Sequence, residues 1–193
     1  MPKAVRTLKF RRRRTGHTNY KKRLASLKSG KPRLVVRRSN RHCIVQVVNY
    51  KPEGDETTVH ITTKHLKRYG WLGKSNIPSA YLCGYLAGKL ATKKGISEAV
   101  LDIGLSTPMH KGVVFAALKG ALDAGLKISH SGEALPSEDK VSGKHIENYA
   151  KMLSDDELNK RFSEYLKENM EPRKLTELFA KAKEAIEKEA GRE

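Results

Sequence analysis

The first 52 residues of the chain contain no aspartate and no glutamate, and the first acid is Glu53. Seventeen of the 39 lysines and arginines precede Glu53, so the other 22 nearly balance the 21 acids. Nearly all of the net charge of +18 therefore lies in one stretch. Because like charges gathered in this way repel one another, we expect a polyanionic partner, either a nucleic acid or an anionic surface.

Cysteine is scarce as well. Cys43 and Cys83 are far apart in the sequence and form no Cys-x-x-Cys pair. This spacing excludes a disulfide framework and indicates free, buried thiols in a reducing compartment. The seven histidines are scattered without ligand spacing. We therefore predict no metal site and no cofactor.

Long apolar runs are missing too. The longest weakly polar stretch, residues 77–88, has about half of the roughly 20 residues that a membrane-spanning helix needs. Gly84 and Gly88 form a G-x-x-x-G pattern in it, which outside a long apolar segment indicates close helix packing in a core. We predict no membrane partner and see no signal peptide. An acid-free, arginine-rich start is also typical of organellar transit peptides, but this one runs directly into a predicted strand.

Residues 1–30 lack sustained apolar periodicity, which predicts a basic arm with one short helix around Tyr20, Leu24 and Leu27. Three antiparallel strands follow. The first begins at Leu34 and meets a hairpin turn at residues 37–40, and the others span residues 43–50 and 57–63. Polar residues alternate with apolar ones in the third strand, so one face of the sheet should be wet or bound to something polar.

The next elements alternate helix and strand. A helix opens at Pro78 with Ser79 as its N-cap and ends at Gly95. A buried strand over residues 99–105, a helix over 112–124 and a short strand over 126–128 complete the pattern. We predict an α/β domain over residues 31–141, with a mixed sheet that joins an antiparallel meander to a parallel strand through a right-handed crossover.

Residues 142–193 alternate lysine with glutamate and carry helical apolar stripes, which predicts a C-terminal helical extension. Ser154 and Glu157 form a capping-box pattern, with Leu158, Phe162, Tyr165 and Leu166 on the face behind it. A last helix follows Pro172. These apolar faces must dock either on the domain or on a neighbouring macromolecule.

The arginine clusters are the strongest functional signal, because guanidinium forks bind phosphates bidentately and release counterions. For the run of four arginines at residues 11–14 alone, a solvated tail or a nuclear-import signal is an equal alternative. Here the basic residues continue into the first strand and its turn, where Arg33, Arg37, Arg38, Asn40 and Arg41 would position a folded nucleic acid. Trp71, in a loop beside Gly70, is a candidate platform for an unpaired base.

Catalysis is not predicted. A mixed sheet of this order is similar to that of ribonuclease-H-like nucleases, which hold metal ions with clustered carboxylates. Asp102 is the only carboxylate on a central predicted strand, and its plain interpretation is a hydrogen bond at the strand end. A DNA-compacting protein remains as the alternative on charge alone, and a metal-dependent nuclease as a third hypothesis.

Several long motifs occur together in one order. They are residues 11–14, 29–40, 69–71, 78–84, 99–105 and 114–126, which read RRRR, SGKPRLVVRRSN, YGW, PSAYLCG, AVLDIGL and VFAALKGALDAGL. With these motifs the chain resembles large-subunit ribosomal protein eighteen, the universal 5S-rRNA-binding family, and its length resembles the archaeal form. The resemblance implies a ribonuclease-H-like α/β fold without nuclease activity. It also implies 5S rRNA, 23S-type rRNA and large-subunit proteins of the central protuberance as partners, in the cytoplasmic ribosome.

The family's RNA contacts can be carried onto matching positions of this sequence. With Lys9, Arg41 and Trp71 added, the predicted RNA-binding residues are Lys9, Arg11, Arg12, Arg13, Arg14, Thr18, Asn19, Tyr20, Lys21, Arg23, Lys31, Arg33, Arg37, Arg38, Asn40, Arg41 and Trp71. The expected function is a structural one, anchoring 5S rRNA in the large subunit. The alternative is a protein that compacts nucleic acid without specificity.

Overall fold

A five-stranded mixed sheet forms the centre of the molecule, with the strand order β3-β2-β1-β4-β5. The computed structural model describes residues 7–192, so residues 1–6 of the predicted arm and residue 193 lie outside the described part. Strands β1 (Arg33–Arg38), β2 (Cys43–Asn49) and β3 (Glu56–Thr62) form an antiparallel meander. Strand β4 (Glu98–Asp102) pairs in parallel with β1, and β5 (Lys127–Ile128) in parallel with β4. The predicted fold class is therefore confirmed.

Two strand boundaries differ from the prediction. Strand β1 continues through Arg38, and the turn is made by residues 39–42, where the Ser39 N–H donates to the His42 carbonyl oxygen at 2.8 Å. Strand β4 ends at Asp102, because Gly104 takes a left-handed φ of +66° that a strand cannot contain. Leu105 is consequently exposed instead of buried.

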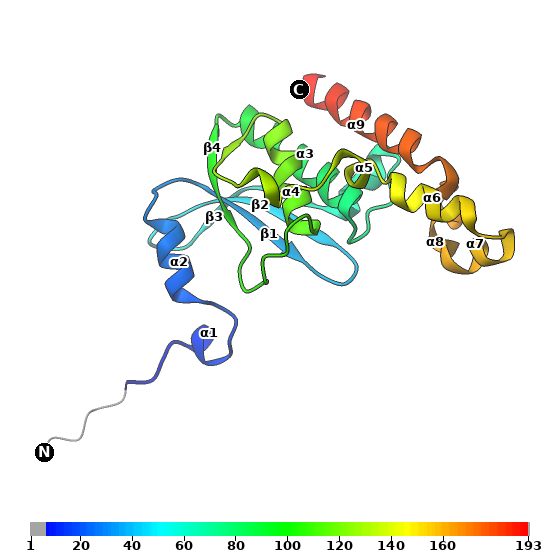
Figure 1. Ribbon diagram of the computed structural model, residues 1–193. Helices are drawn as coiled ribbons and strands as arrows, with labels where there is room; N and C mark the ends of the chain where they lie inside the picture. The colour runs from blue at the N-terminus through cyan, green and yellow to red at the C-terminus, as the bar shows by residue number, and fades with distance from the viewer. Residues whose placement is uncertain (1–6, 193) are drawn as a thin grey trace, which may run out of the picture.

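Helices α3 (Ile77–Lys93) and α4 (Val113–Asp123) cover one face of the sheet (Figure 1). A Cβ atom on Gly84 would overlap the carbonyl oxygen of Ala117, and one on Gly120 would overlap that of Tyr81. The two helix backbones can approach this closely only because both positions are glycine. The predicted packing role of the G-x-x-x-G pattern is confirmed.

The caps of α3 are only partly those predicted. Asn76 is the N-cap, and its side-chain oxygen accepts from the Ser79 N–H at 3.1 Å. Ser79 is instead a buried acceptor, since its Oγ accepts from Trp71 Nε1 and from the Lys74 N–H. At the other end Gly95 follows the helix with φ +77°, as predicted.

The two faces of the meander differ in burial. Val45, Val59 and Ile61 point into the core beneath α3, whereas His60 is exposed and Thr62 half-buried on the opposite face. The predicted wet face of the third strand is confirmed. Cys43 and Cys83 are both free and buried in the core, as predicted.

The C-terminal helices dock on the domain. They are α5 (Glu138–Val141), α6 (Lys144–Met152), α7 (Asp155–Arg161), α8 (Ser163–Lys167) and α9 (Leu175–Arg192). Leu175, Phe179 and Ile186 of α9 join the same hydrophobic core as α3. Ser154 is the N-cap of α7 but forms no side-chain cap hydrogen bond, and the predicted continuous helix divides at Phe162. Within the described residues no helix has the length and apolarity to cross a membrane.

The N-terminal arm contains two helices, α1 (Arg11–Arg14) and α2 (Tyr20–Leu27), of which the second was predicted. Figure 1 shows the arm projecting from the end of the body that is far from α6, α7 and α8. The arm and the C-terminal helices therefore present separate surfaces.

Candidate RNA interface

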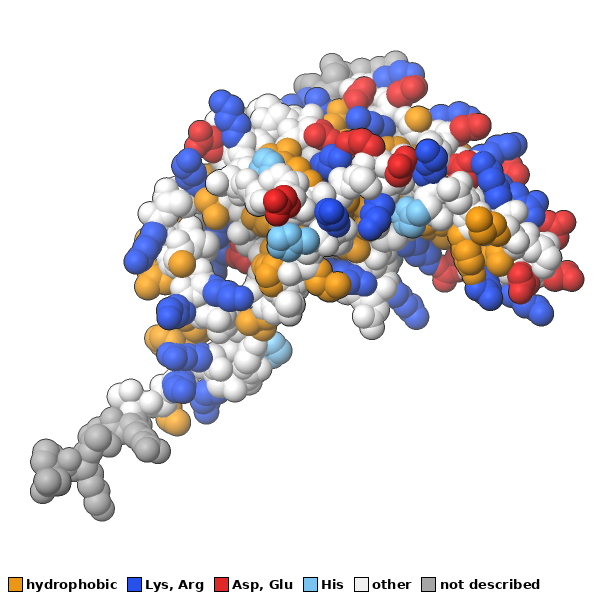
Figure 2. All heavy atoms as spheres, in the orientation of Figure 1, with side chains coloured by type: hydrophobic (Ala, Val, Ile, Leu, Met, Phe, Trp, Pro, Cys, Tyr) orange, Lys and Arg blue, Asp and Glu red, His pale blue; other side chains and the backbone are white. Residues whose placement is uncertain are grey.

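Helix α1 presents four consecutive arginines, and all four side chains are exposed. Arg12 Nε donates to Thr18 Oγ1 at 2.8 Å, which links α1 to the segment before α2. Within residues 7–192, none of the four arginines forms an ion pair with a carboxylate. In Figure 2 Lys and Arg side chains gather along the arm, whereas both signs of charge mix over the C-terminal helices.

Helix α2 continues this basic surface towards the body. Asn19 is its N-cap, and the Asn19 side-chain oxygen accepts from the Lys22 N–H at 3.1 Å. The Tyr20 ring packs on the Phe10 ring with the centroids 5.5 Å apart. Lys21 and Lys22 are exposed. The cap and the ring contact thus order a segment whose charges alone would drive it apart.

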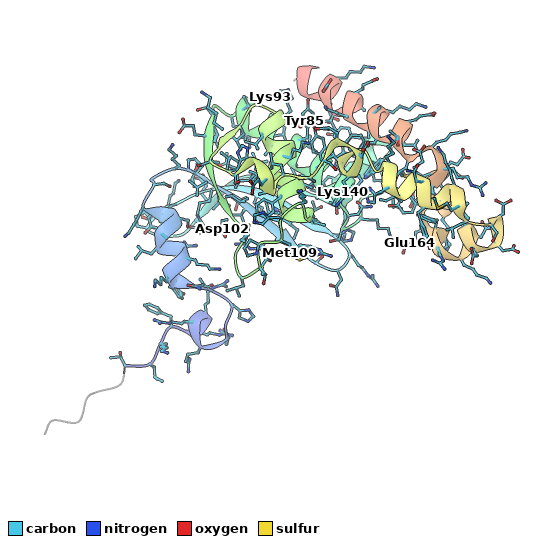
Figure 3. The ribbon with its side chains drawn as sticks, in the orientation of Figure 1. Tyr85, Lys93, Asp102, Met109, Lys140 and Glu164 are labelled. Carbon is cyan, nitrogen blue, oxygen red and sulfur yellow. The ribbon has the colours of Figure 1, made fainter. Side chains whose placement is uncertain are left out.

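Five charged side chains fasten the arm to the body and form what we call the arginine–aspartate network. Arg33 lies between the two acids, with Nη2 2.6 Å from Asp55 Oδ2 and Nη1 2.8 Å from Asp102 Oδ2. Arg23 of α2 binds the other oxygen of Asp55 at 2.8 Å. Arg37 binds the other oxygen of Asp102 at 3.0 Å. The network therefore joins α2, β1, the turn before β3 and the end of β4, where Figure 3 labels Asp102.

The arginines of the network favour the ionised form of both acids. The hydrogen bond from Arg23 lowers the pKa of Asp55 against the effect of burial, and the charge of Arg33 adds to the shift. Burial alone would raise the pKa of Asp102, but Arg37, the Gly104 N–H and Arg33 together lower it below its ordinary value. Three arginines on two carboxylates leave the network with one net positive charge.

A groove of about 410 Å³ lies beside the network, between the arm and the end of β4, and we call it the arm groove. Residues 101–106 form one wall, and Arg12, Lys22 and Arg23 lie on the other. Asp102 is the only acid among the residues that line it. The described residues contain no cluster of His, Cys, Asp or Glu that could hold a metal ion. The groove is thus suited to an anion.

Comparisons with known proteins bear directly on this surface. Residues 6–98 and 89–131 match the family model described as "Ribosomal large subunit proteins 60S L5, and 50S L18". The chain belongs to this family. It is 49% identical over 181 residues to the large ribosomal subunit protein uL18 of Korarchaeum cryptofilum, a match that covers 93% of each chain. It is 50% identical over 183 residues to the protein of the same name from Methanothermobacter thermautotrophicus, covering 94% of this chain and 95% of the relative.

Several of the predicted RNA contacts are exposed, and most of these form no ion pair within the described part of the chain, as expected of residues that bind RNA in a member of this family. The predicted contacts Lys9, Arg38 and Arg41 are exposed and form no ion pair with the described residues, as is true of the α1 arginines. Asn40 is exposed beside them at the tip of the β1–β2 hairpin. Lys31 is half-exposed and lies 2.5 Å from Glu98. All of these remain predicted RNA contacts of a family member.

Two predicted contacts need correction. Arg33 is 4% exposed, and both of its terminal nitrogens bind carboxylates, so it holds the network together and is not a surface phosphate ligand. Trp71 is 1% exposed, and its ring packs edge-on against Phe179 of α9 with the centroids 5.9 Å apart. Trp71 is therefore a core residue. The glycine beside it correctly marked a turn but carried no information on which way the indole points.

Two further features of the surface were missed from the sequence. Lys22 lines the arm groove. Because it lies in the acid-free run, the sequence alone could have placed it among the predicted RNA-binding residues. Asp55 could not have been foreseen as a partner of Arg23, because the two are 32 residues apart and meet only through the tertiary fold. Residues 103–105, predicted as the end of a strand, instead form part of a loop that lines the arm groove.

Proposed function

We propose that the chain is a structural, non-enzymatic component of the large ribosomal subunit that binds 5S rRNA and helps to anchor it in the central protuberance. Its proposed partners are 5S rRNA, 23S-type rRNA and neighbouring large-subunit proteins, and its proposed place is the cytoplasmic ribosome. One observation carries the proposal: the α1 arginines, Lys21 and Lys22 of α2, and Arg38 and Arg41 of the β1–β2 hairpin are exposed, and none of them forms an ion pair with a carboxylate of the described residues.

The proposed mode of binding is a series of phosphate contacts placed by a rigid body. Exposed, unpaired arginines are free to form bidentate bonds with phosphate oxygens, and counterion release supplies the free energy. Such contacts position a protein on RNA and do not read bases. The arginine–aspartate network fixes α2 relative to β1, so that the arm and the hairpin tip present their charges in one geometry.

The test is the identity of the RNA that the full-length chain selects. We expect 5S rRNA to be enriched from a total RNA mixture at about 0.2 M salt, where non-specific phosphate binding weakens. An unrelated structured RNA of similar length and a duplex DNA of equal charge serve as competitors. Recovery of a heterogeneous RNA population, with equal competition by the duplex DNA, would instead support a non-specific nucleic-acid-compacting protein.

A further inference from the structure

The arm groove is lined by apolar side chains as well as by cations, and a phosphate group would contact only the cations. Ile103 and Leu105 line its β4 side, and Arg12 and Lys22 line its arm side. A volume of about 410 Å³ falls in the range of pockets that hold small organic ligands, about 300 to 1,000 Å³, and exceeds what a phosphate group fills. An apolar wall facing a cationic wall suits a ligand that is itself flat and apolar at one end and anionic at the other.

A buried donor lies at the same groove. Arg33 lines it, and although both terminal nitrogens of Arg33 bind carboxylates, its Nε is buried without a hydrogen-bond partner among the described residues. Buried donors are normally paired because an unpaired one is costly. Arg37, half-buried at the same lining, adds a guanidinium plane on which a ring can stack.

The β4 wall is held in place before any ligand arrives. The Gly104 N–H donates to Asp102 Oδ1 at 2.8 Å, and Arg37 Nη1 donates to the Asp102 carbonyl oxygen at 2.7 Å. A Cβ atom on Gly104 would lie 2.8 Å from the Arg37 guanidinium carbon, so this loop lies directly against the network. A preformed wall lowers the ordering cost of binding.

We propose that the arm groove holds one unpaired nucleotide of the bound RNA, with its phosphate towards Arg12 and Lys22 and its base against Ile103 and Leu105. A nucleotide inside a duplex cannot enter, because its base is stacked and paired, whereas a bulged or looped-out nucleotide can. The proposal rests on the proposed function and deepens it: the exposed arm cations supply affinity, and the groove gives a site that distinguishes folded RNA with an unpaired nucleotide from plain duplex.

The test compares two variants of the full-length chain that add the same charge at adjacent positions. Ser106→Glu places a carboxylate in the groove, and Thr107→Glu places one on an exposed residue that does not line it. We expect Ser106→Glu to lose about tenfold or more in affinity for 5S rRNA, the scale of one stacked base. Thr107→Glu should stay within about threefold of the unmodified chain, since an exposed charge is screened.

Chemical probing of the RNA gives the second readout. An unpaired nucleotide should be protected by the unmodified chain and by Thr107→Glu but not by Ser106→Glu. Equal loss of affinity or of protection in the two variants would overturn the proposal, as would the absence of any nucleotide that responds.

A third measurement does not depend on 5S rRNA. Titration with UMP and AMP should shift the backbone amide resonances of residues 104–106, whereas inorganic phosphate at the same concentration should not. If phosphate shifts them equally, the groove is an anion site only and the nucleotide proposal fails. If the chain shows no preference for 5S rRNA but the nucleotides still shift these amides, the proposed function fails and the groove proposal stands.

Discussion

The N-terminal arm and the C-terminal helices are both rich in lysine and arginine, yet the two ends of the chain use that charge in opposite ways. In the C-terminal helices basic residues are interspersed with acids in the sequence, and some pair with them, as Lys151 does with Glu147 and Arg173 with Asp155. Among the described residues of the arm, residues 7–30, Arg23 alone pairs with an acid, and that acid lies in the body. Charge that is neutralised within a segment supports its fold, whereas charge that is left unpaired needs a partner from outside.

The apolar residues of the two regions show the reverse distribution. Leu175 and Ile186 of α9 are fully buried against the domain, while Phe10 and Leu24 of the arm are 73% and 60% exposed. Burial of apolar surface is what fixes a helix to a domain. The C-terminal helices are thus held by the core, and the arm by five side chains of a charged network.

The largest expected effect is on affinity for 5S rRNA, which should depend on the cations of the arm and not on those of the C-terminal helices. Replacement of Arg11–Arg14 by Ala should lower affinity for 5S rRNA by about two to three decades near 0.15 M salt, and flatten the salt dependence by about 0.7 to 0.9 log units per lost phosphate contact. The matched control removes four exposed lysines from the other end, Lys160, Lys167, Lys181 and Lys188. Equal losses in the two variants, measured by salt-dependent titration, would show that only net charge matters.

The second prediction separates the regions by stability. Leu175→Ala should lower the free energy of unfolding by about 2 to 5 kcal/mol, because the Leu175 side chain is fully buried and leaves a cavity. Leu24→Ala in the arm removes the same atoms from an exposed site and should change stability by less than about 0.5 kcal/mol. Denaturant unfolding measures both. A large loss from Leu24→Ala would mean that the arm is folded into the core after all.

The third prediction concerns the network that joins arm to body. Asp102→Asn removes a carboxylate shared by Arg33 and Arg37 and leaves the buried Arg33 with one anionic partner, which should cost about 2 to 3 kcal/mol in unfolding free energy. Asp155→Asn breaks an exposed pair with Arg173 and should cost less than about 1 kcal/mol. Similar values for the two variants in thermal unfolding would contradict the structural role given to Asp102.

The sequence predicted features that depend on residues close together in the chain better than features that depend on the tertiary fold. Elements set by local pattern were found, including α2 from the spacing of Tyr20, Leu24 and Leu27, and the close packing at Gly84. The end of β4 was placed too late, because Val100 and Leu101 read as one apolar run with Ile103 although the chain turns at Gly104.

The candidate site was predicted less completely than the fold. Charge pattern identifies which segment is basic but not which arginines are already paired, since pairing depends on acids such as Asp55 and Asp102 that arrive from distant parts of the chain. Arg33 and Arg38 look alike in the sequence, yet one is buried between carboxylates and the other is exposed. The two residues fall on opposite faces of one strand, at its start and its end.

The smallest expected effect is a pH dependence confined to the C-terminal helices. Hydrogen bonds from Lys151 and from Thr176 lower the pKa of Glu147 from its ordinary 4.5 to about 2. Because the folded-state pKa is the lower one, this contribution to stability is complete above about pH 4.5 and is lost as the pH falls towards 2. The Glu147 carboxylate accepts from the Thr176 N–H at 2.9 Å in the first turn of α9, so it fastens α6 to that helix.

Glu147→Gln should therefore lower the unfolding free energy at pH 7 by about 1 to 3 kcal/mol and reduce its fall between pH 4.5 and 2. Exposed Glu157, replaced by Gln, is the control and should leave the pH profile unchanged. The 5S rRNA affinity at neutral pH should be the same in both variants, because neither position lies on the arm. If the unfolding free energy of the Glu147→Gln variant fell with acid as steeply as that of the unmodified chain, the Glu147 carboxylate would not be what holds α9.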